Sequence, residues 1–384
     1  MGQDTGPTPG APEDGHGRLL SRRDVLRGGL AAGGLAAGFS IFGSSPSALA
    51  APVAAGRKFR IALANSYIGN VWRIEMENLL KAASKMEPYK SQVQLSIFNA
   101  PNTSVSAQQS QMTDMISSGY DAILLDAASG SGLNGVIAEA THRGVLVVSF
   151  DNVVTAPSAA KVNIDQYFFG RTWAEFLAKK LNGKGNVIMV TGVAGASANA
   201  QRNAGAEQVW AKYPGIKIVT RYTGEWDAAV AEKNTVGVLP SLPKIDGIWC
   251  QGGVYGVLNA FKAAGRPLPY TAGEAENGFR LYLAGYLKPR VDGVSIGQPP
   301  YNGVAALELA RRLLLKMPQK REITLLPPVL YSNQVKVGVS AFPNLPHSFF
   351  DDFTGSGSNP TVVFDSNAAL HGTPSGSSLK VILP

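Results

Sequence analysis

The sequence predicts an α/β protein made of two lobes, each a doubly wound parallel β-sheet with helices on both faces. From residue 59 onward, short apolar runs alternate with segments whose apolar side chains recur with helical spacing. Strands separated by helices of about 10 to 15 residues form right-handed βαβ units, and therefore parallel sheets. The alternation starts again near residue 165 and yields too many strands for one sheet, so we expect two similar lobes.

The first half of the chain gives the predicted elements in a regular order. A short apolar run at 122–126 is typical of a strand that is buried on both faces. In the segment 71–86, the apolar residues Ile74, Leu79, Leu80 and Ala83 recur with helical spacing. The same reasoning predicts strands at 59–64, 93–98, 122–126 and 145–150, and helices at 71–86, 104–117 and 133–143.

The second half continues this order and ends in a less regular segment. Past residue 343 the chain is rich in Gly, Ser, Pro and Asn and has no long periodic segment. We therefore expect residues 346–384 to be a tail that lies over one lobe and is partly disordered. Before this tail, the pattern predicts helices at 168–181, 198–213, 227–239, 254–264, 277–287 and 304–315, and strands at 186–191, 217–222, 247–250, 270–272 and 294–297.

The N-terminal residues predict export from the cytoplasm. Arg22 and Arg23 precede an apolar, charge-free run at 28–42, and an Ala-Leu-Ala sequence follows at 48–50. Paired arginines, a short apolar run and a small-residue cleavage site are typical of a twin-arginine signal peptide. The apolar run is shorter than the roughly 20 residues that span a bilayer. We expect residues 1–50 to be this signal, which is either cleaved or kept as a weak membrane tether, and the mature protein to be periplasmic or extracytoplasmic.

Composition limits the classes of partner. The net charge of +8 is spread thinly, and no basic stripe is interleaved with aromatic residues, so we expect no nucleic-acid partner. Cys250 is the only cysteine, so no internal disulfide can form, and no cysteine near the end of the signal offers a lipid attachment site. No later segment is long and apolar enough to span a membrane, which predicts a globular mature chain.

The sequence lacks the usual catalytic and metal-binding motifs. Of the four histidines, only His142 lies on a predicted helix of the core, and no pair of histidines has metal-ligand spacing. Neither a Walker A sequence nor a G-x-G-x-x-G motif follows the first strand. We therefore expect no catalytic residues, no metal ion and no cofactor.

Polar and aromatic side chains follow the carboxyl ends of the predicted strands in both lobes, where open α/β sheets bind ligands. Carboxylate, amide and guanidinium groups match hydroxyls, which both donate and accept, and Trp offers a flat face to a sugar ring. Each polar residue alone could be a helix cap or a loop residue, and each Trp a core residue, but the repeated placement favours a ligand site. The candidates are Ser66, Asn70, Trp72, Arg73, Asp151, Asn152, Arg202, Trp226, Gln251, Glu274 and Gln298.

Four short motifs carry a resemblance to a known family. They are Ile61-Ala62-Leu63 followed by Ser66 and Asn70, Val147-Val148-Ser149-Phe150-Asp151, Gly192-Val193-Ala194-Gly195-Ala196-Ser197 with Arg202, and Gly297-Gln298-Pro299. Over roughly residues 58 to 330 the chain resembles the periplasmic sugar-binding proteins of ABC transporters, in particular the ribose-binding-like group with the type I periplasmic binding protein fold.

This resemblance implies a three-stranded hinge between the lobes, with crossings near residues 164, 298 and 327. The first lobe would comprise residues 58–164 plus 299–327, and the second lobe residues 165–298 plus 328–345.

The resemblance also implies that the candidate side chains hold a sugar from both lobes. Asp151 would accept hydrogen bonds from two hydroxyls, and Arg202 would donate to ring or hydroxyl oxygens. Trp72 would stack on one face of the sugar, and Trp226 would cover the other. Further contacts would come from Ser66, Asn70 and, on the hinge side, Gln298.

Several candidate positions depart from the family pattern. Arg73 stands where a second aromatic residue is frequent, and Asn152 stands where ribose-binding proteins carry an arginine. Gln251 is followed by two glycines in place of Asn and Asp, and the Gly-Phe-Asp that follows in the family is replaced by glycine, Glu274 and alanine. These departures favour a pentose other than D-ribose, a hexose or a polyol.

The sequence therefore predicts an exported solute-binding protein, expected to be a monomer, that captures a sugar or polyol and delivers it to an ABC permease without chemical change. One alternative is an exported carbohydrate-acting α/β enzyme that uses carboxylates such as Asp151 and Glu274. Another is a sugar-sensing regulator or chemoreceptor component of the same fold. A repressor would need an N-terminal helix-turn-helix of about 60 residues, where this chain carries its predicted export signal.

Overall fold

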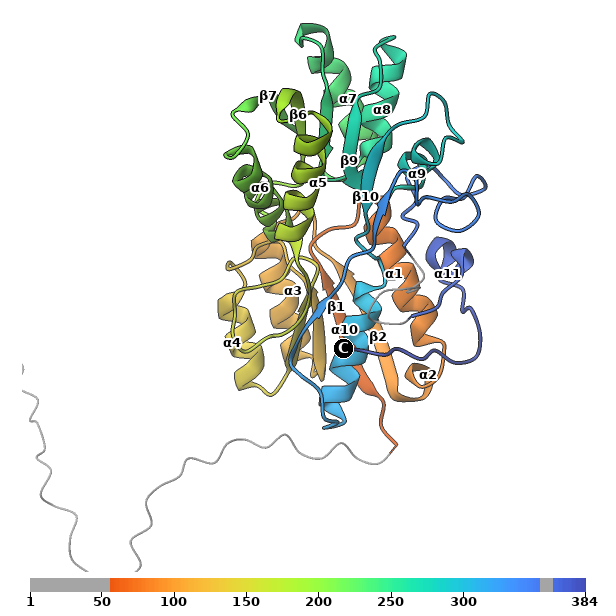
Figure 1. The fold of residues 1–384 in the computed structure, drawn as a ribbon. Helices are drawn as coiled ribbons and strands as arrows, with labels where there is room; N and C mark the ends of the chain where they lie inside the picture. The colour runs from red at the N-terminus through yellow and green to blue at the C-terminus, as the bar shows by residue number, and fades with distance from the viewer. Residues whose placement is uncertain (1–55, 353–361) are drawn as a thin grey trace, which may run out of the picture. The chain divides into compact units, whose positions relative to one another are not determined.

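The computed structural model describes residues 56–352 and 362–384. The predicted signal peptide lies outside the described residues. The described chain forms two six-stranded sheets, each with helices on both faces (Figure 1). No helix within these residues has the length and apolar character needed to cross a membrane.

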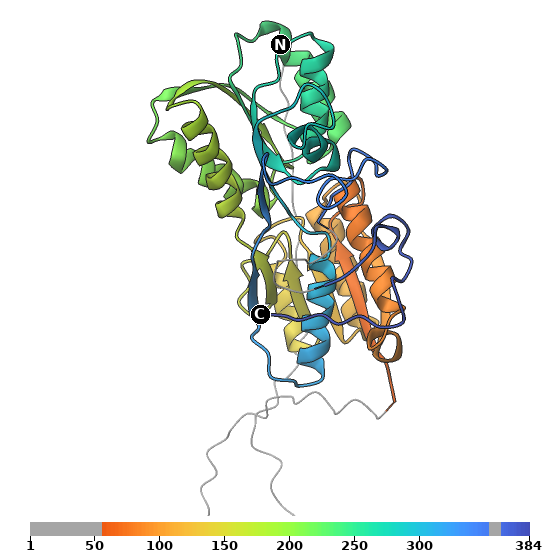
Figure 2. The same cartoon turned by 45° about the vertical axis from the view of Figure 1, so that its right-hand side comes forward.

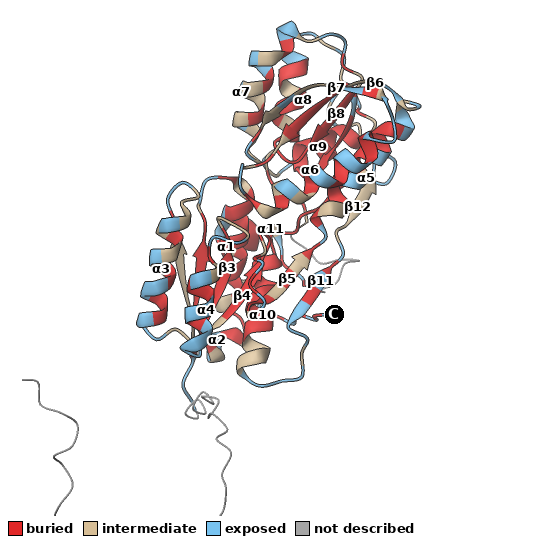
Figure 3. Cartoon of the chain, turned by 90° about the vertical axis from the view of Figure 1, so that its left-hand side faces the viewer, coloured by how far each residue is buried: buried red, intermediate tan, exposed pale blue. Residues whose placement is uncertain are grey.

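The first sheet has the strand order β11-β5-β4-β3-β1-β2, and every pair in it is parallel. Its strand β3 is buried at every residue, because helices cover both faces of the sheet (Figure 3). Its strands are β1 (Phe59–Asn65), β2 (Val93–Asn99), β3 (Ala122–Asp126), β4 (Leu146–Phe150), β5 (Ala160–Ile164) and β11 (Glu322–Leu325). The helices of this lobe are α1 (Val71–Ser84), α2 (Tyr89–Gln92), α3 (Val105–Ser117), α4 (Asn134–His142) and α10 (Asn302–Leu314).

The second sheet has the strand order β12-β10-β9-β8-β6-β7 and is parallel except for β12, which runs antiparallel to β10. Its strands are β6 (Lys184–Thr191), β7 (Gly215–Thr223), β8 (Gly247–Cys250), β9 (Tyr270–Glu274), β10 (Gly293–Ile296) and β12 (Val329–Tyr331). Its helices are α5 (Gln166–Lys180), α6 (Ser197–Trp210), α7 (Ala228–Val238), α8 (Val254–Ala263), α9 (Asn277–Leu283) and a 3-10 turn at Leu239–Ser241.

The chain passes between the two sheets three times. It leaves the first sheet after β5, returns after β10 by way of α10, which packs on β4, and crosses again from β11 to β12. Two parallel-dominated sheets joined by three connections confirm the predicted fold class. Such a connection allows the lobes to move as units about a hinge.

Helix caps fix where the site-bearing helices begin. The Asn70 side chain accepts from the backbone N–H of Arg73 and so starts α1 directly after β1. Asp165 caps α5 and Asp227 caps α7 in the same way. The polar residues that the sequence placed at strand ends thus include structural caps, one of which, Asn70, is also a predicted site residue.

Helices α5 and α6 approach each other closely because glycines face the opposite backbone. A Cβ on Gly170 would overlap the carbonyl oxygen of Arg202, and a Cβ on Gly205 would overlap that of Tyr167. This contact sets the position of Arg202 on α6 relative to the rest of the second lobe.

The C-terminal residues 362–384 pack on the first lobe and contain a helix that was not predicted. Residues 366–371 form α11 (Ser366–His371), which lies beside α1 (Figure 2). The Asn78 side chain donates to the carbonyl oxygens of Ala369 and Leu370, both at 2.9 Å. Phe364 and Leu379 are buried in the core that also holds α1 and α10 residues. The apolar residues of this segment have no period, so neither the short helix nor the burial of these side chains was predicted.

Candidate functional site

A cavity lies between the lobes, at the carboxyl ends of both sheets. All but one of its lining residues end or follow a strand, or lie within the first two turns of the next helix, where open α/β sheets bind ligands. The exception comes from the C-terminal segment. The lining residues are Asn70, Trp72, Arg73, Asp151, Ala198, Arg202, Trp226, Glu274, Gln298 and Phe350.

Most of the predicted site residues line this cavity, and three do not. Ser66 is buried, and its backbone N–H donates to the carbonyl oxygen of Asp126 at 3.1 Å. Asn152 and Gln251 lie behind the lining and hold other side chains. The sequence missed Phe350, because it lies in the predicted tail, and also a small lining alanine that carries no chemical signal.

Asp151 directly follows β4, and both of its carboxylate oxygens accept hydrogen bonds. Oδ1 accepts from Gln298 Nε2 at 2.5 Å, and Oδ2 accepts from Asn152 Nδ2 at 2.8 Å. The backbone of Asp151 is left-handed, with φ of 55°. Non-glycine residues in this conformation concentrate at ligand sites, where the surrounding structure holds them in place. The carboxylate is therefore held at one point of the cavity wall.

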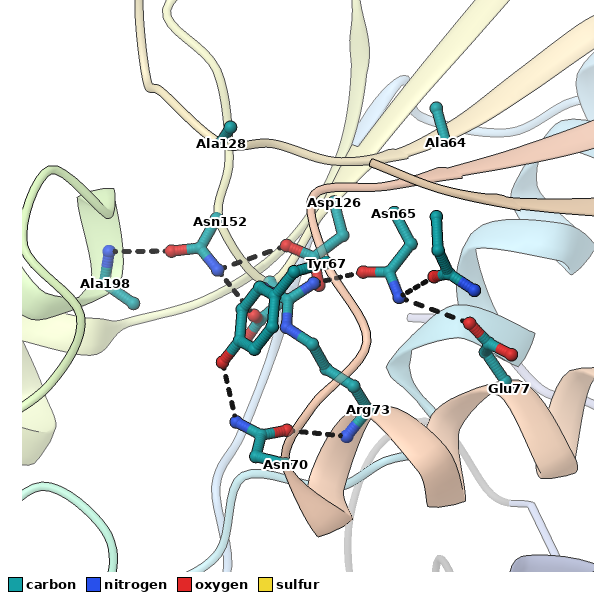
Figure 4. A network of polar contacts seen from close by, with 12 residues as sticks. Ala64, Asn65, Tyr67, Asn70, Arg73, Glu77, Asp126, Ala128, Asn152 and Ala198 are labelled. Atoms are coloured by element: carbon teal, nitrogen blue, oxygen red, sulfur yellow. Dashed lines mark hydrogen bonds and ion pairs between the residues drawn. The ribbon is translucent and has the colours of Figure 1, made fainter. Parts of the chain in front are cut away.

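Arg73 is held by a buried polar network in the first lobe (Figure 4). Its guanidinium forms an ion pair with Asp126 at 2.7 Å, donates to Asn65 and lies over the Tyr67 ring, 4.3 Å from the centroid. The two charged side chains are 2% and 0% exposed. Asp126 was not predicted as part of the site, although it ends an apolar strand as Asp151 nearly does.

Asn70 has both of its polar side-chain atoms engaged by the protein. Oδ1 accepts from the Arg73 backbone N–H at 3.0 Å, and Nδ2 donates to the Tyr67 hydroxyl at 2.9 Å (Figure 4). A ligand hydroxyl near Asn70 would share these atoms with the helix cap.

Asn152 joins the two lobes. Its Nδ2 donates to Asp126 Oδ1 at 3.1 Å and to Asp151, and its Oδ1 accepts from the Ala198 backbone N–H at 3.3 Å, at the start of α6 (Figure 4). The amide thus positions the carboxylates of the first lobe against the second lobe.

Arg202 occupies the corresponding place in the second lobe and is 2% exposed. Its guanidinium pairs with Glu274 Oε1 at 2.8 Å and donates to Gln166 Oε1 at 2.8 Å and to the Gln251 carbonyl oxygen at 3.0 Å. It also lies over the Phe169 ring, 4.7 Å from the centroid. Removing one partner of such a buried pair costs about 3–5 kcal/mol, because the other charge is left uncompensated.

The two predicted indoles differ in how far they are buried. Trp72 is 5% exposed, and its Nε1 donates to the Gln298 carbonyl oxygen at 2.6 Å. Trp226 is half-buried, has a left-handed backbone with φ of 56°, and donates to Gln251 Oε1 at 3.2 Å. A Cβ on Gly192 would overlap its indole, so the absence of a side chain there makes room for the ring.

Burial sets the ionisation of the two lining carboxyl groups. Burial raises the pKa of Asp151 to about 7, and the nearby Asp126 adds to this while Arg73 and Arg202 oppose it. Burial likewise raises the pKa of Glu274 to about 7, against the opposing charge of Arg202. Both groups therefore titrate near neutral pH.

The free volume that these side chains enclose is about 20 Å³. This volume holds a water molecule, whereas a sugar needs a cavity many times larger. A sugar-sized ligand must therefore separate the lobes or displace contacts such as that between Asp151 and Gln298.

A larger hollow of about 690 Å³ lies on the second lobe beside Phe176, Lys180 and Tyr331. Two of its charged side chains already pair, since Lys180 contacts Asp292 at 2.5 Å, and both remain over a third exposed. The cavity between the lobes brings together more buried polar groups, and we take it as the candidate site.

Relatives of this chain are recognised by sequence, and a solved structure shares its fold as well. The xylitol-binding protein of Mycolicibacterium smegmatis is 32% identical over 174 residues, which span 44% of this chain and only 50% of that protein. The ribose import binding protein of Bacillus subtilis is 26% identical over 70% of this chain and 87% of its own length. The crystal structure of an ABC transporter solute binding protein from Thermobispora bispora DSM 43833 is 27% identical, covers 85% of this chain and 99% of its own, and has a TM-score of 0.68.

The family pattern of the periplasmic binding protein domain matches residues 61–317, which include every strand except β11 and β12 and every lining residue of the cavity except Phe350. The chain therefore belongs to the periplasmic binding protein domain family.

Proposed function

We propose that this chain is an extracytoplasmic solute-binding protein that captures a sugar or polyol between its lobes and delivers it to an ABC permease. One observation carries the proposal: Asp151 from the first lobe and Arg202 from the second line the same cavity. A ligand that contacts both lobes at once stabilises the closed form, because only that form offers both sets of contacts.

The charges around the cavity favour a neutral ligand with many hydroxyls. Arg73 is compensated by Asp126, and Arg202 by Glu274, so neither arginine needs an anionic ligand. The remaining carboxyl group, Asp151, can accept hydrogen bonds from hydroxyls. The ribose and xylitol ligands named for the two relatives have this chemistry, and the departures at the site favour a different pentose, a hexose or a polyol.

Aromatic rings would supply the apolar contacts to the ligand. Trp72 and Trp226 come from different lobes and border the same cavity. Their faces suit the C–H surface of a sugar. The ligand would thus lie with its hydroxyls toward the charged pairs and its ring hydrogens toward the indoles.

The remaining parts of the proposal concern location and partners. The protein leaves the cytoplasm by the twin-arginine route, acts as a monomer, and returns its ligand unchanged to a permease. It binds no nucleic acid. The paired arginines of the leader support the export route, and a sequence without a basic, aromatic-rich stripe supports the proposal that no nucleic acid is bound.

A thermal-shift screen of the purified protein against pentoses, hexoses and polyols tests the proposal. A ligand present at 100 times its Kd should stabilise the folded state by about 2.7 kcal/mol. Asp151→Asn serves as the matched control, because it keeps the shape of the site and should lose most of the shift. If no sugar or polyol stabilises the protein, the proposed ligand class is wrong.

The alternative of a carbohydrate-acting enzyme is tested on the same ligand. Asp151 and Glu274 both titrate near neutral pH, as acid–base groups of an enzyme would. If the chain is a binding protein, chromatography and NMR should show the recovered ligand to be chemically unchanged after prolonged incubation. Conversion of excess ligand by a catalytic amount of the protein would support the carbohydrate-acting enzyme instead.

A further inference from the structure

The segment 346–352, which we call the strap, is fastened to the second lobe by backbone pairing. The N–H groups of Asn277 and Gly278 donate to the carbonyl oxygens of Phe349 and His347, at 2.7 and 2.8 Å. The Asp351 N–H donates to the carbonyl oxygen of Ala275 at 3.2 Å. These partners follow β9 directly, so the strap lies along the sheet end that carries Glu274.

A buried ion pair adds to this attachment. Both outer nitrogens of the Arg280 guanidinium donate to the Asp352 carboxylate, at 2.9 and 3.0 Å, and the arginine side chain is 1% exposed. A bidentate contact of this kind fixes the orientation of the two side chains as well as the distance between them. The strap is therefore held rigidly at the edge of the cavity.

The strap also reaches the first lobe. The Phe350 backbone N–H donates to Glu75 Oε1 at 2.9 Å, on the buried face of α1. The Phe350 residue is 2% exposed, belongs to the apolar core that includes Trp72, and lines the cavity between the lobes. One aromatic side chain of the strap is thus anchored from both lobes and faces the candidate site.

We infer that Phe350 is a ligand-contacting residue that helps to determine specificity, and that the strap positions its ring. This inference rests on the proposed function and names a third aromatic wall beside Trp72 and Trp226. The ring limits the size of the ligand at this end of the cavity and meets its C–H surface. Because both lobes hold the strap, ring position is coupled to lobe position.

Phe350→Ala tests the contact, with Phe364→Ala as the matched control. Both residues are buried phenylalanines of the C-terminal segment, but only Phe350 lines the cavity. We expect Phe350→Ala to weaken binding of the best wild-type ligand about tenfold and to change the ranking toward bulkier sugars. Phe364→Ala should lower the melting temperature and leave Kd within about twofold. If the alanine variant folds poorly, the milder Phe350→Leu takes its place and should show an intermediate loss of ligand affinity.

Substitutions of Glu75 test whether the strap positions the ring. Burial raises the pKa of Glu75 well above its ordinary value, so glutamine closely imitates the protonated carboxyl group and can still accept from the Phe350 N–H. Glu75→Gln should retain the affinity and ligand ranking of the wild type. Glu75→Leu removes the acceptor and should shift the ranking in the same direction as Phe350→Ala.

Calorimetry with the sugar panel separates the outcomes. If the wild type binds a sugar and Phe350→Ala and Phe350→Leu match it in affinity and ranking, the role of Phe350 is wrong and the proposed function stands. If Glu75→Leu matches Glu75→Gln, the strap does not position the ring. If the wild type binds no member of the panel, the inference and the proposed function both fail.

Discussion

Replacing Asp151 probes the first-lobe half of the site. Its two oxygens accept from Gln298 and Asn152 in the structure, at 2.5 and 2.8 Å. A ligand hydroxyl must displace the Gln298 amide at one oxygen, while a second hydroxyl adds a contact at a free lone pair. The net gain lies between one and two hydrogen bonds to a charged group, each about 1.5–3 kcal/mol. Asp151→Ala should therefore weaken binding by about 3 kcal/mol, or roughly 100-fold.

The stability of the same variants checks that the loss is local. The Asp151 charge is buried near Asp126 and Glu274, so its removal should not destabilise the fold at pH 8. Alanine adds a cost of about 1 kcal/mol for the left-handed backbone, whereas asparagine tolerates it. Asp151→Asn should thus melt at or above the wild-type temperature and still bind at least about tenfold more weakly.

Isothermal titration calorimetry and thermal unfolding of both variants complete this test. Unchanged affinity in Asp151→Ala and Asp151→Asn would remove the carboxylate from the site. A loss of affinity that appears only together with a large drop in melting temperature would point to a structural role instead.

The remaining predictions concern the indoles, pH and export. Ligand should change the intrinsic tryptophan fluorescence in a saturable way. Trp226→Ala should weaken binding by about 1.5–3 kcal/mol with little loss of stability, whereas the variant of the buried Trp72, Trp72→Ala, should also lose about 3–5 kcal/mol of stability. An unchanged Kd would assign either residue to the core alone. Because burial raises the pKa of Asp151 from 3.8 to about 7, the folded protein keeps a proton that the unfolded chain releases between these values. The melting temperature should therefore fall as pH rises from 5 to 8, and Asp151→Asn should make this slope shallower; equal slopes would contradict the assignment. Changing Arg22 and Arg23 together to lysine should leave the protein in the cytoplasm by cell fractionation, and normal export of this variant would rule out the twin-arginine route.

The sequence predicted nine of the twelve strands found in the described residues and missed β5, β11 and β12. Runs such as 122–125 and 247–250 are apolar throughout because both sheet faces are covered, and this pattern is visible without a structure. The short edge strands β11 and β12 have four and three residues, and such brief segments carry little pattern. The exact residue limits of the two lobes stay a prediction.

Site residues could be predicted where a functional side chain closely follows a predicted strand. Asp151 and Arg202 could be named in advance because the carboxyl ends of parallel strands converge. Charge partners such as Asp126, which pairs with Arg73, were not predicted. Their contacts depend on packing between separate strands and helices. Phe350 lies far from the other lining residues in sequence, and only the pairing of the strap with residues after β9 brings it to the cavity.

The most direct test of the account is a crystal structure of the protein with the sugar or polyol that the screen identifies. We expect the ligand between the lobes, with its hydroxyls hydrogen-bonded to Asp151 of the first lobe and Arg202 of the second, and with the Gln298 amide displaced from Asp151. A ligand bound in the surface hollow beside Lys180, or held by one lobe alone, would contradict the account.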